Sequence, residues 1–330
     1  MTVRTMQLPA DLLPLADVVT ESFQYPENES WSVQMDEKKQ MSSTMRGFYR
    51  MWPIIRLAQA LSPSLRDVVR GCVWEEDGRM VGTTLVQRRS LTDVWIIGDV
   101  GVLPAYRRRG IARKLMEATL DLIRSRGGKK AILEVIDGNL PAIRLYEQLG
   151  FVHFGRNIVF HASLDGVPPE PALPENYQRT KLAPFDWQPR FQLEKRISPA
   201  HQVRYDPVEE SRFRQPVIMR LLRPVVMAAQ GTRDEEFIIR TTHQNLIVAR
   251  GGFTVYKRGK GVDHLNIRLD PAHPDLADYM VRTLLIRVKT LSPENRLECS
   301  VPQWMEAVVI ALETAGFERR MESHLMGIEL

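Results

Sequence analysis

Residues 100–112 decide the fold of this chain. They read Val100-Gly101-Val102-Leu103-Pro104-Ala105-Tyr106-Arg107-Arg108-Arg109-Gly110-Ile111-Ala112 and follow the apolar run Trp95-Ile96-Ile97. The pattern predicts a strand that ends before Pro104, a basic loop that contains Gly110, and a helix that begins at Ile111. The first N–H groups of a helix lack intrahelical partners, and the helix dipole favours negative charge there. The stretch therefore predicts an anion-binding site at a helix N-terminus.

The charges around Gly110 favour a phosphate-bearing ligand. Arg113 and Lys114 follow three arginines in the first turn of the predicted helix, where positive charge opposes the helix dipole unless an anion binds. A dinucleotide-binding loop would need three glycines, and a phosphate-binding P-loop would end in Gly-Lys-Ser or Gly-Lys-Thr. Neither pattern is present, and a solvated basic helix start is the structural alternative.

A second motif follows the predicted helix, whose apolar face carries Ile111, Leu115, Ala118 and Leu122. After Gly127-Gly128 comes an apolar strand over residues 131–135, and then the run Asp137-Gly138-Asn139-Leu140-Pro141-Ala142-Ile143-Arg144-Leu145-Tyr146-Glu147-Gln148-Leu149-Gly150-Phe151. Asn139 is a typical N-cap, Pro141 suits a first helical turn, and Gly150 suits a helix end.

The two motifs in this order resemble the GNAT family of N-acetyltransferases. The resemblance rests on Arg-x-x-Gly-x-Ala behind Val-x-Val, and on an Asn that opens a helix with a Tyr and a final Gly-Phe. It implies an α/β fold with a mixed sheet flanked by helices, and acetyl-CoA as the co-substrate, with no metal. The residues that it assigns to acetyl-CoA are Val100, Gly101, Val102, Arg107, Arg108, Arg109, Gly110, Ile111, Ala112, Arg113, Asn139 and Tyr146.

The resemblance also implies catalytic roles. Tyr146 matches the family's tyrosine, whose phenol can donate a proton or a hydrogen bond to the sulfur of CoA. Its structural alternative is a half-buried helix tyrosine. For the base that takes the amine's proton, Asp99 is the first candidate and Glu134 the second, while several family members use water alone. Strand alternation puts Asp99 on the face opposite Val100 and Val102, which would turn it to solvent.

The chain is long enough for two domains. Its 330 residues exceed one ordinary domain, and 44% hydrophobic residues can fill two cores. A proline-rich segment near the middle is typical of an extended linker. We expect an N-terminal domain over residues 1–165 with the intact acetyl-CoA loop, a linker over residues 166–176, and a C-terminal domain over residues 177–330.

The second half resembles a degenerate copy of the first. Residues 265–272 parallel the strand that ends at Pro104-Ala105, residues 296–300 parallel the later strand, and Gly316-Phe317 parallels Gly150-Phe151. Where the first half has the arginines and Gly110, the second has Pro274-Asp275-Leu276-Ala277-Asp278, and Leu312 stands in the place of Tyr146. Two carboxylates there would repel a phosphate. We therefore predict a tandem protein whose second domain lacks the usual CoA site, the alternative being an unrelated α/β domain.

The N-terminal residues fit the same fold. Residues 3–6 are predicted as a strand, and Leu12, Leu15, Ala16, Val19 and Phe23 form one helix face. Residues 69–74, 79–87 and 94–102 are predicted as an antiparallel meander with a turn at Glu76-Asp77-Gly78. In the apolar segment between the first predicted helix and this meander, Pro53 should break or kink a helix. Phe48, Tyr49 and Trp52 are expected in the core, with an apolar pocket lining as the alternative.

Composition removes several other functions. Cys72 and Cys299 have no spacing that suits a disulfide framework or a zinc site. No apolar run approaches a membrane span, so a cytoplasmic protein is expected. The net charge of +5 is spread through both halves, without a nucleic-acid motif, so no nucleic-acid partner is expected.

Two functional hypotheses remain open. The first is an N-acetyltransferase that moves the acetyl group of acetyl-CoA to an amine acceptor by direct attack. The acceptor is expected to be a small amine, and a protein substrate and a homodimer are also compatible with the sequence. The second hypothesis is a non-catalytic acyl-CoA-binding or regulatory protein.

Overall fold

The computed structural model describes residues 2–25, 31–32, 35–61, 66–67, 69–162, 169, 171–256, 261–292 and 295–330. The chain forms two compact units. Unit 1 comprises Met1–Phe154 with two short additions, Arg204–Asp206 and His324–Leu330, and unit 2 comprises Gly155–Val203 and Pro207–Ser323. Residues 166–168 and 170 of the predicted proline-rich linker lie outside the described residues.

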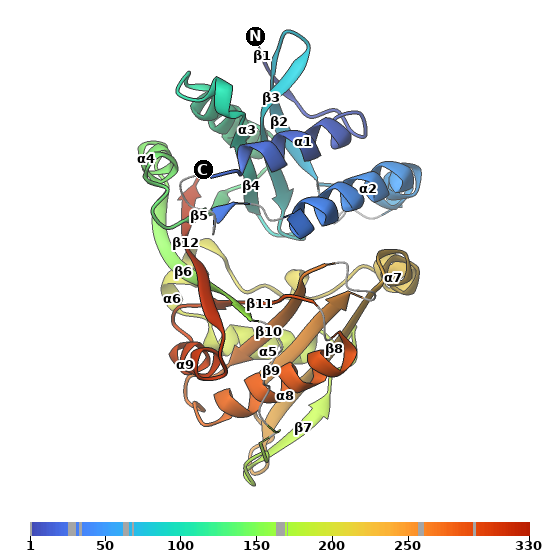
Figure 1. Ribbon diagram of the computed structural model, residues 1–330, viewed down its shortest axis with the longest axis vertical. Coiled ribbons are helices and arrows are strands. Elements are labelled where there is room, and N and C mark those ends of the chain that lie inside the picture. The colour runs from blue at the N-terminus through green and yellow to red at the C-terminus, as the bar shows by residue number, and fades with distance from the viewer. Residues whose placement is uncertain are drawn as a thin grey trace. The chain divides into compact units, whose positions relative to one another are not determined.

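Unit 1 is a mixed sheet with helices on both faces (Figure 1). Its strands follow the order β1-β2-β3-β4-β5 and then β12. Neighbours from β1 to β4 are antiparallel, whereas β4 and β5 are parallel. Its elements are β1 (Thr2–Thr5), α1 (Leu12–Ser22), α2 (Met35–Leu61), β2 (Arg70–Glu76), β3 (Arg79–Arg88), β4 (Val94–Val102), a short 3-10 helix (Pro104–Tyr106), α3 (Ile111–Ser125), β5 (Lys130–Ile136), α4 (Leu140–Gln148) and the start of β6 (Val152–Ala162). The predicted first strand and three-stranded meander are confirmed.

Two glycines let helices approach opposite faces of this sheet. A Cβ on Gly82 would lie 3.0 Å from the Leu115 side chain of α3. A Cβ on Gly101 would lie 2.9 Å from the Cβ of Ser22, at the end of α1. Gly82 pairs with Val102, so Gly101 faces the other side, because side chains alternate along a strand. The helices α1 and α3 therefore cover opposite faces (Figure 1).

Unit 2 repeats the same succession of elements. Its strands follow the order β12-β6-β11-β10-β9-β8-β7, in which β10 and β11 are parallel and the pairs from β7 to β10 are antiparallel. Its elements are β7 (Tyr177–Lys181), α5 (Gln188–Ile197), α6 (Ala200–Tyr205, whose last two residues belong to unit 1), a 3-10 helix (Glu210–Arg212), α7 (Val217–Gln230), β8 (Thr232–Thr241), β9 (Ile247–Tyr256), β10 (Asp263–Leu269), α8 (Leu276–Leu291), β11 (Leu297–Pro302), α9 (Glu306–Thr314) and β12 (Glu318–Glu329). The predicted repeat of one mixed α/β fold is confirmed.

Residues 324–330 complete unit 1, although they come last in the chain. The Leu330 N–H donates to the Lys129 carbonyl at 2.8 Å, next to β5. Met326 is fully buried among the side chains of the α3, β4 and β5 core, which includes Trp95 and Leu133. His324 Nε2 lies 2.8 Å from Asp137 Oδ1. The core of unit 1 thus depends on a segment about 200 residues away from its other strands.

The segment after α1 differs in part from what the sequence predicts. The helix α2 continues through Pro53 from Met35 to Leu61, so Pro53 does not break it. The expectation that Phe48 and Tyr49 lie in the core is wrong, since 40% and 45% of their surfaces are exposed.

Candidate functional site

A bulge and a splay reshape β4 at the predicted site. Thr83 pairs with Gly101 and Leu85 with Gly98, so one residue of β3 opposes both Asp99 and Val100. Asp99 has a φ of 49°, which a non-glycine residue seldom adopts. On the other side of β4, the last parallel pair with β5 is Ile97–Leu133, among the residues that the structure describes. Residues 98–102 of β4 therefore extend beyond the parallel ladder with β5.

Gly110 opens α3 after the short loop that follows β4. It is the N-cap of α3, with φ 75° and ψ 4°, a left-handed conformation that glycine adopts without strain. A Cβ built on Gly110 would meet no heavy atom within 4 Å. The first turn of α3 contains no acidic residue, and Ile111 is buried while Ala112 and Arg113 are half-buried. The predicted helix start is confirmed, and a side chain would have space at Gly110 among the described residues.

The predicted arginines point in different directions. Arg107 donates to the Ser22 carbonyl at 2.8 Å and to the Val102 carbonyl at 3.2 Å, so it ties the end of α1 to the end of β4. Arg109 pairs with the buried Glu76 carboxylate at 2.9 Å. Arg113 donates to Gln148 of α4. These three guanidinium groups hold the loop and its helix in place.

Arg108 borders a cavity between the basic loop and α4. The cavity has a volume of 280 Å³, and its lining comprises Arg108, Leu140, Pro141, Arg144, Leu145 and Gln148. Arg108 itself adopts a left-handed conformation with φ 63°. Two arginines thus line a partly apolar recess beside the start of α3.

Asn139 and Tyr146 take the positions that the sequence predicts. The Asn139 side chain caps α4 by accepting from the Ala142 N–H at 3.3 Å. Tyr146 is 6% exposed and packs against Phe151 at a ring-centroid distance of 6.0 Å. Burial raises the pKa of the Tyr146 phenol, and the nearby Tyr25 adds to the rise. This phenol stays protonated at neutral pH and can act as a hydrogen-bond donor.

The sequence analysis missed Tyr25, which lies beside this pair. Burial raises its pKa, while the positive charge of Arg107 and a hydrogen bond from the Asn139 side chain lower it in part. The ring of Trp31 packs edge-on against Tyr25 at 5.7 Å, and the Tyr25 N–H donates to Ser32 Oγ at 2.8 Å. No local motif marks Tyr25, because Arg107 and Asn139, which act on its hydroxyl, lie more than 80 residues away in the sequence.

The two candidate bases differ in their surroundings. Asp99 is half-buried, and burial raises the pKa of its carboxyl group. Glu134 lies on β5 with an exposed side chain. The solvent-facing orientation expected for Asp99 assumed strict alternation, which the bulge at this residue interrupts. Of the two, Asp99 is the more enclosed carboxyl group.

In the corresponding region of unit 2 the parallel ladder also ends early. The basic helix start around Gly110, which we call the cradle, is replaced there by an acidic one. The last parallel pair of β10 and β11 is Leu265–Cys299, although β10 continues to Leu269. The N-cap of α8 is Asp275, and its first turn contains Asp278, which pairs with Arg282 at 2.5 Å. Leu312 is fully buried in the place of Tyr146. The backbone of the fold persists here while the groups that would attract a phosphate are replaced.

The described part of the chain shows neither a cluster of metal ligands nor a helix that could span a membrane. No group of three or more His, Cys, Asp and Glu side chains there is arranged to hold a metal ion. No helix there has the length and apolar character needed to cross a membrane.

In comparisons with known proteins, residues 34–151 match the model of the acetyltransferase (GNAT) family. A mycothiol acetyltransferase of Corynebacterium glutamicum is 34% identical over 112 residues, which are 33% of this chain and 37% of that protein. N-alpha-acetyltransferase 30 of Schizosaccharomyces pombe is 32% identical over 84 residues, 24% of this chain and 56% of that protein. The matches thus span roughly a third to just over half of the relatives' own length.

A solved structure resembles the chain over both units. It is a tandem GNAT protein from the clavulanic acid biosynthesis pathway, with a TM-score of 0.65 and 15% sequence identity. The alignment covers 99% of this chain and 98% of that one. At this identity the likeness establishes the fold, which is that of two GNAT-like domains in tandem.

Proposed function

Because residues 34–151 match the model of the acetyltransferase (GNAT) family, we propose that the chain transfers the acetyl group of acetyl-CoA to an amine acceptor in unit 1. One observation carries the proposal. The parallel ladder of β4 and β5 ends at Ile97–Leu133, while β4 continues to Val102 and a short loop then leads to Gly110, the N-cap of α3. The gap between the strands and the helix N-terminus would then serve the two ends of one extended co-substrate.

Acetyl-CoA fits the groups that unit 1 offers. The open space at Gly110 and the N–H groups of Ile111, Ala112 and Arg113 suit its pyrophosphate. Arg108, beside the 280 Å³ cavity, adds a positive charge for the same phosphates. The backbone of Val100, Gly101 and Val102 faces the gap where the pantetheine arm and the thioester would lie.

When bound, acetyl-CoA supplies an activated acetyl group, and the chain's residues manage the protons. The Asp99 carboxylate takes the proton of the attacking amine, directly or through water, and its raised pKa suits a base that works near neutral pH. The Tyr146 phenol donates its hydrogen bond toward the leaving sulfur. Asn139, which holds the hydroxyl of Tyr25, fixes the second phenol beside the first.

We propose that unit 2 binds no acetyl-CoA. Asp275 and Asp278 occupy the start of α8, where the first unit has Gly110 and a positive first turn. A pyrophosphate at this position would meet two carboxylates. The second unit would then support the first or help to define the acceptor.

Calorimetric titration with acetyl-CoA tests the binding claims. We expect one site per chain. Two sites would contradict the assignment for unit 2, and the absence of binding would contradict the whole proposal.

Turnover is tested with Tyr146→Phe beside the wild type. Panels of small amines and of peptides with free N-termini serve as acceptors, and release of free thiol reports the reaction. We expect Tyr146→Phe to lower kcat by about 10²-fold or more and to leave acetyl-CoA affinity nearly unchanged. Unchanged kcat would remove Tyr146 from the mechanism. Binding of acetyl-CoA without turnover on either panel would favour a non-catalytic binding protein.

A further inference from the structure

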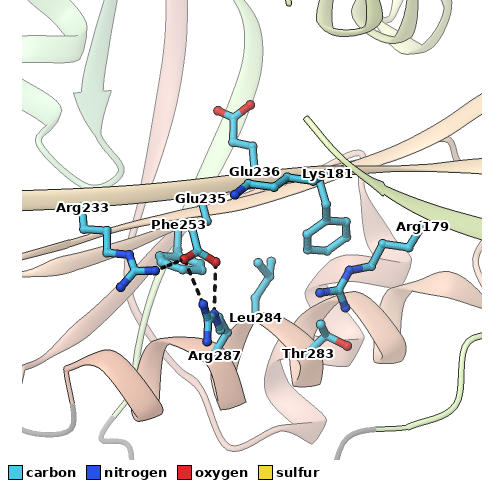
Figure 2. Close-up of a pocket in the computed structure, with 10 residues that line it drawn as sticks. Arg179, Lys181, Arg233, Glu235, Glu236, Phe253, Thr283, Leu284 and Arg287 are labelled. Carbon is cyan, nitrogen blue, oxygen red and sulfur yellow. Dashed lines mark hydrogen bonds and ion pairs between the residues drawn. The ribbon is translucent and has the colours of Figure 1, made fainter. Parts of the chain in front are cut away.

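Unit 2 contains a cavity that the proposed acetyl transfer does not use. It has a volume of 490 Å³ and lies among β7, β8, β9 and α8 (Figure 2). Its helical lining, Thr283, Leu284 and Arg287, comes from the second half of α8. It is therefore separate from the start of α8, which corresponds to the cradle of unit 1. Its volume is within the range of about 300–1,000 Å³ that is common for small-molecule sites.

The cavity lies toward the outer strands β7 and β8 of unit 2, which α8 contacts less than it contacts β9 and β10. The helix α3 contacts all four strands from β1 to β4, whereas the contacts of α8 centre on β9 and β10. The outer strands β7 and β8 then face the helix mainly with long side chains. Arg233, Glu235 and Phe237 alternate on one face of β8, and Arg179 and Lys181 do so on β7.

Positive charge dominates this cavity. Four basic side chains line it: Arg179, Lys181, Arg233 and Arg287. The Glu235 carboxylate lies between Arg233 at 2.5 Å and Arg287 at 3.0 Å, and these guanidinium groups lower the pKa of Glu235. The Glu236 carboxylate points away in Figure 2 and pairs with Arg190 at 2.6 Å. One ionised carboxylate therefore faces four cations.

Arg179 is an exposed residue of β7 whose guanidinium lies on an apolar floor. The guanidinium lies over the Phe237 ring at 4.7 Å from the centroid, and its Nη1 donates to the Tyr279 hydroxyl at 3.1 Å. Phe253 and Leu284, which also line the cavity, are almost fully buried. A guanidinium that already contacts a ring and a phenol is oriented in part before an oxyanion binds, and its planar fork matches phosphate and carboxylate.

We propose that this cavity binds a small organic oxyanion, a phosphate or carboxylate group on an apolar body, with Arg179 and Lys181 at the oxyanion. Phe253 and Leu284 would contact the apolar body. The proposal does not depend on acetyl transfer in unit 1.

Calorimetry on the full chain with three probes tests the proposal. Phenyl phosphate and benzoate carry the two oxyanions on one ring, and benzyl alcohol is the neutral control. We expect one site for at least one of the two anions and none for the alcohol. The tighter anion identifies the natural group. Equal binding of the alcohol, or no binding of either anion at millimolar concentration, would overturn the proposal.

Two charge changes locate the binding. Lys181→Gln should weaken the tighter anion about tenfold, as the loss of one charge-assisted contact predicts. Lys289→Gln removes the same charge from α8 outside the cavity and should leave affinity unchanged. Equal weakening in both variants would show a general charge effect and refute the site.

A third variant should change the affinity for the anion in the opposite direction. Glu235→Gln removes the carboxylate that faces Arg233 and Arg287 and should strengthen anion binding several-fold. Weaker or unchanged binding in a variant with a wild-type circular dichroism spectrum would contradict the assigned electrostatics. Lys181 is exposed, so Lys181→Gln should fold normally. Its affinity for the anion still tests the site if Glu235→Gln unfolds.

Discussion

Gly110 offers a test in which stability and ligand affinity should respond in opposite directions. The perturbation is the isosteric pair Gly110→Asn and Gly110→Asp. Both side chains fit, because a Cβ at Gly110 meets no atom within 4 Å. Both tolerate the left-handed conformation that the φ of 75° requires better than other residues do. The two variants therefore differ in one negative charge and in little else.

The negative charge of Gly110→Asp should stabilise the helix and weaken the binding of acetyl-CoA. Arg113 and Lys114 follow Gly110, and a carboxylate at the N-cap also favours the helix dipole, so Gly110→Asp should be as stable as Gly110→Asn or more stable by about 0.3–1 kcal/mol. A carboxylate about 6 Å from one phosphate charge costs about 1.5–3 kcal/mol at an effective dielectric constant of about 20–40. That range corresponds to about ten- to hundredfold weaker binding of acetyl-CoA.

Thermal unfolding and calorimetric titration of the two variants in the same buffer supply both numbers. The reasoning predicts a lower acetyl-CoA affinity for Gly110→Asp at equal or higher Tm. Equal affinities in the two variants would refute the placement of the pyrophosphate at this helix start. A Tm that falls in parallel with affinity would instead attribute the loss to damage of the fold.

Three further predictions concern other parts of unit 1. Asp99→Asn should remove the acidic limb of the pH profile of kcat/KM, because the wild-type base loses its proton above the ordinary range of a carboxyl group; an unchanged profile would assign the base to water. Gly101→Ala should lower the Tm, since its Cβ would lie 2.9 Å from the Cβ of Ser22, and a wild-type Tm would mean that α1 moves away freely. Met326→Ala should destabilise unit 1 by about 2–5 kcal/mol in chemical denaturation, and a cost below about 1 kcal/mol would show that residues 324–330 do not complete its core.

The sequence predicts those parts of the fold that local signals encode. Gly110, Asn139 and Gly150 each combine a cap or turn preference with a neighbouring apolar pattern, and the helix boundaries follow them. The strand succession in both units and the loss of the cradle in the second follow for the same reason.

Long-range contacts are what the sequence does not reveal. Arg107 lies in the predicted anion loop, yet its guanidinium binds the Ser22 carbonyl 85 residues away. Tyr25 reaches Asn139 from the far end of α1. The bulge at Asp99 shows itself only in the pairing with β3, so strict alternation gives the wrong face for this residue. Such features depend on packing between distant segments, for which one sequence carries no periodic signal.

The pairing of Leu330 with Lys129 has a consequence for biosynthesis. During translation, β5 is synthesised about 200 residues before the segment that pairs beside it. Unit 1, which we propose as the catalytic domain, can therefore complete its fold only after unit 2 has been synthesised. High sequence separation of this kind slows folding and leaves a strand edge exposed in the meantime. Cutting the gene between the two halves would yield an N-terminal fragment without its closing strand. A split that preserves folding would have to move residues 324–330 along with the first half.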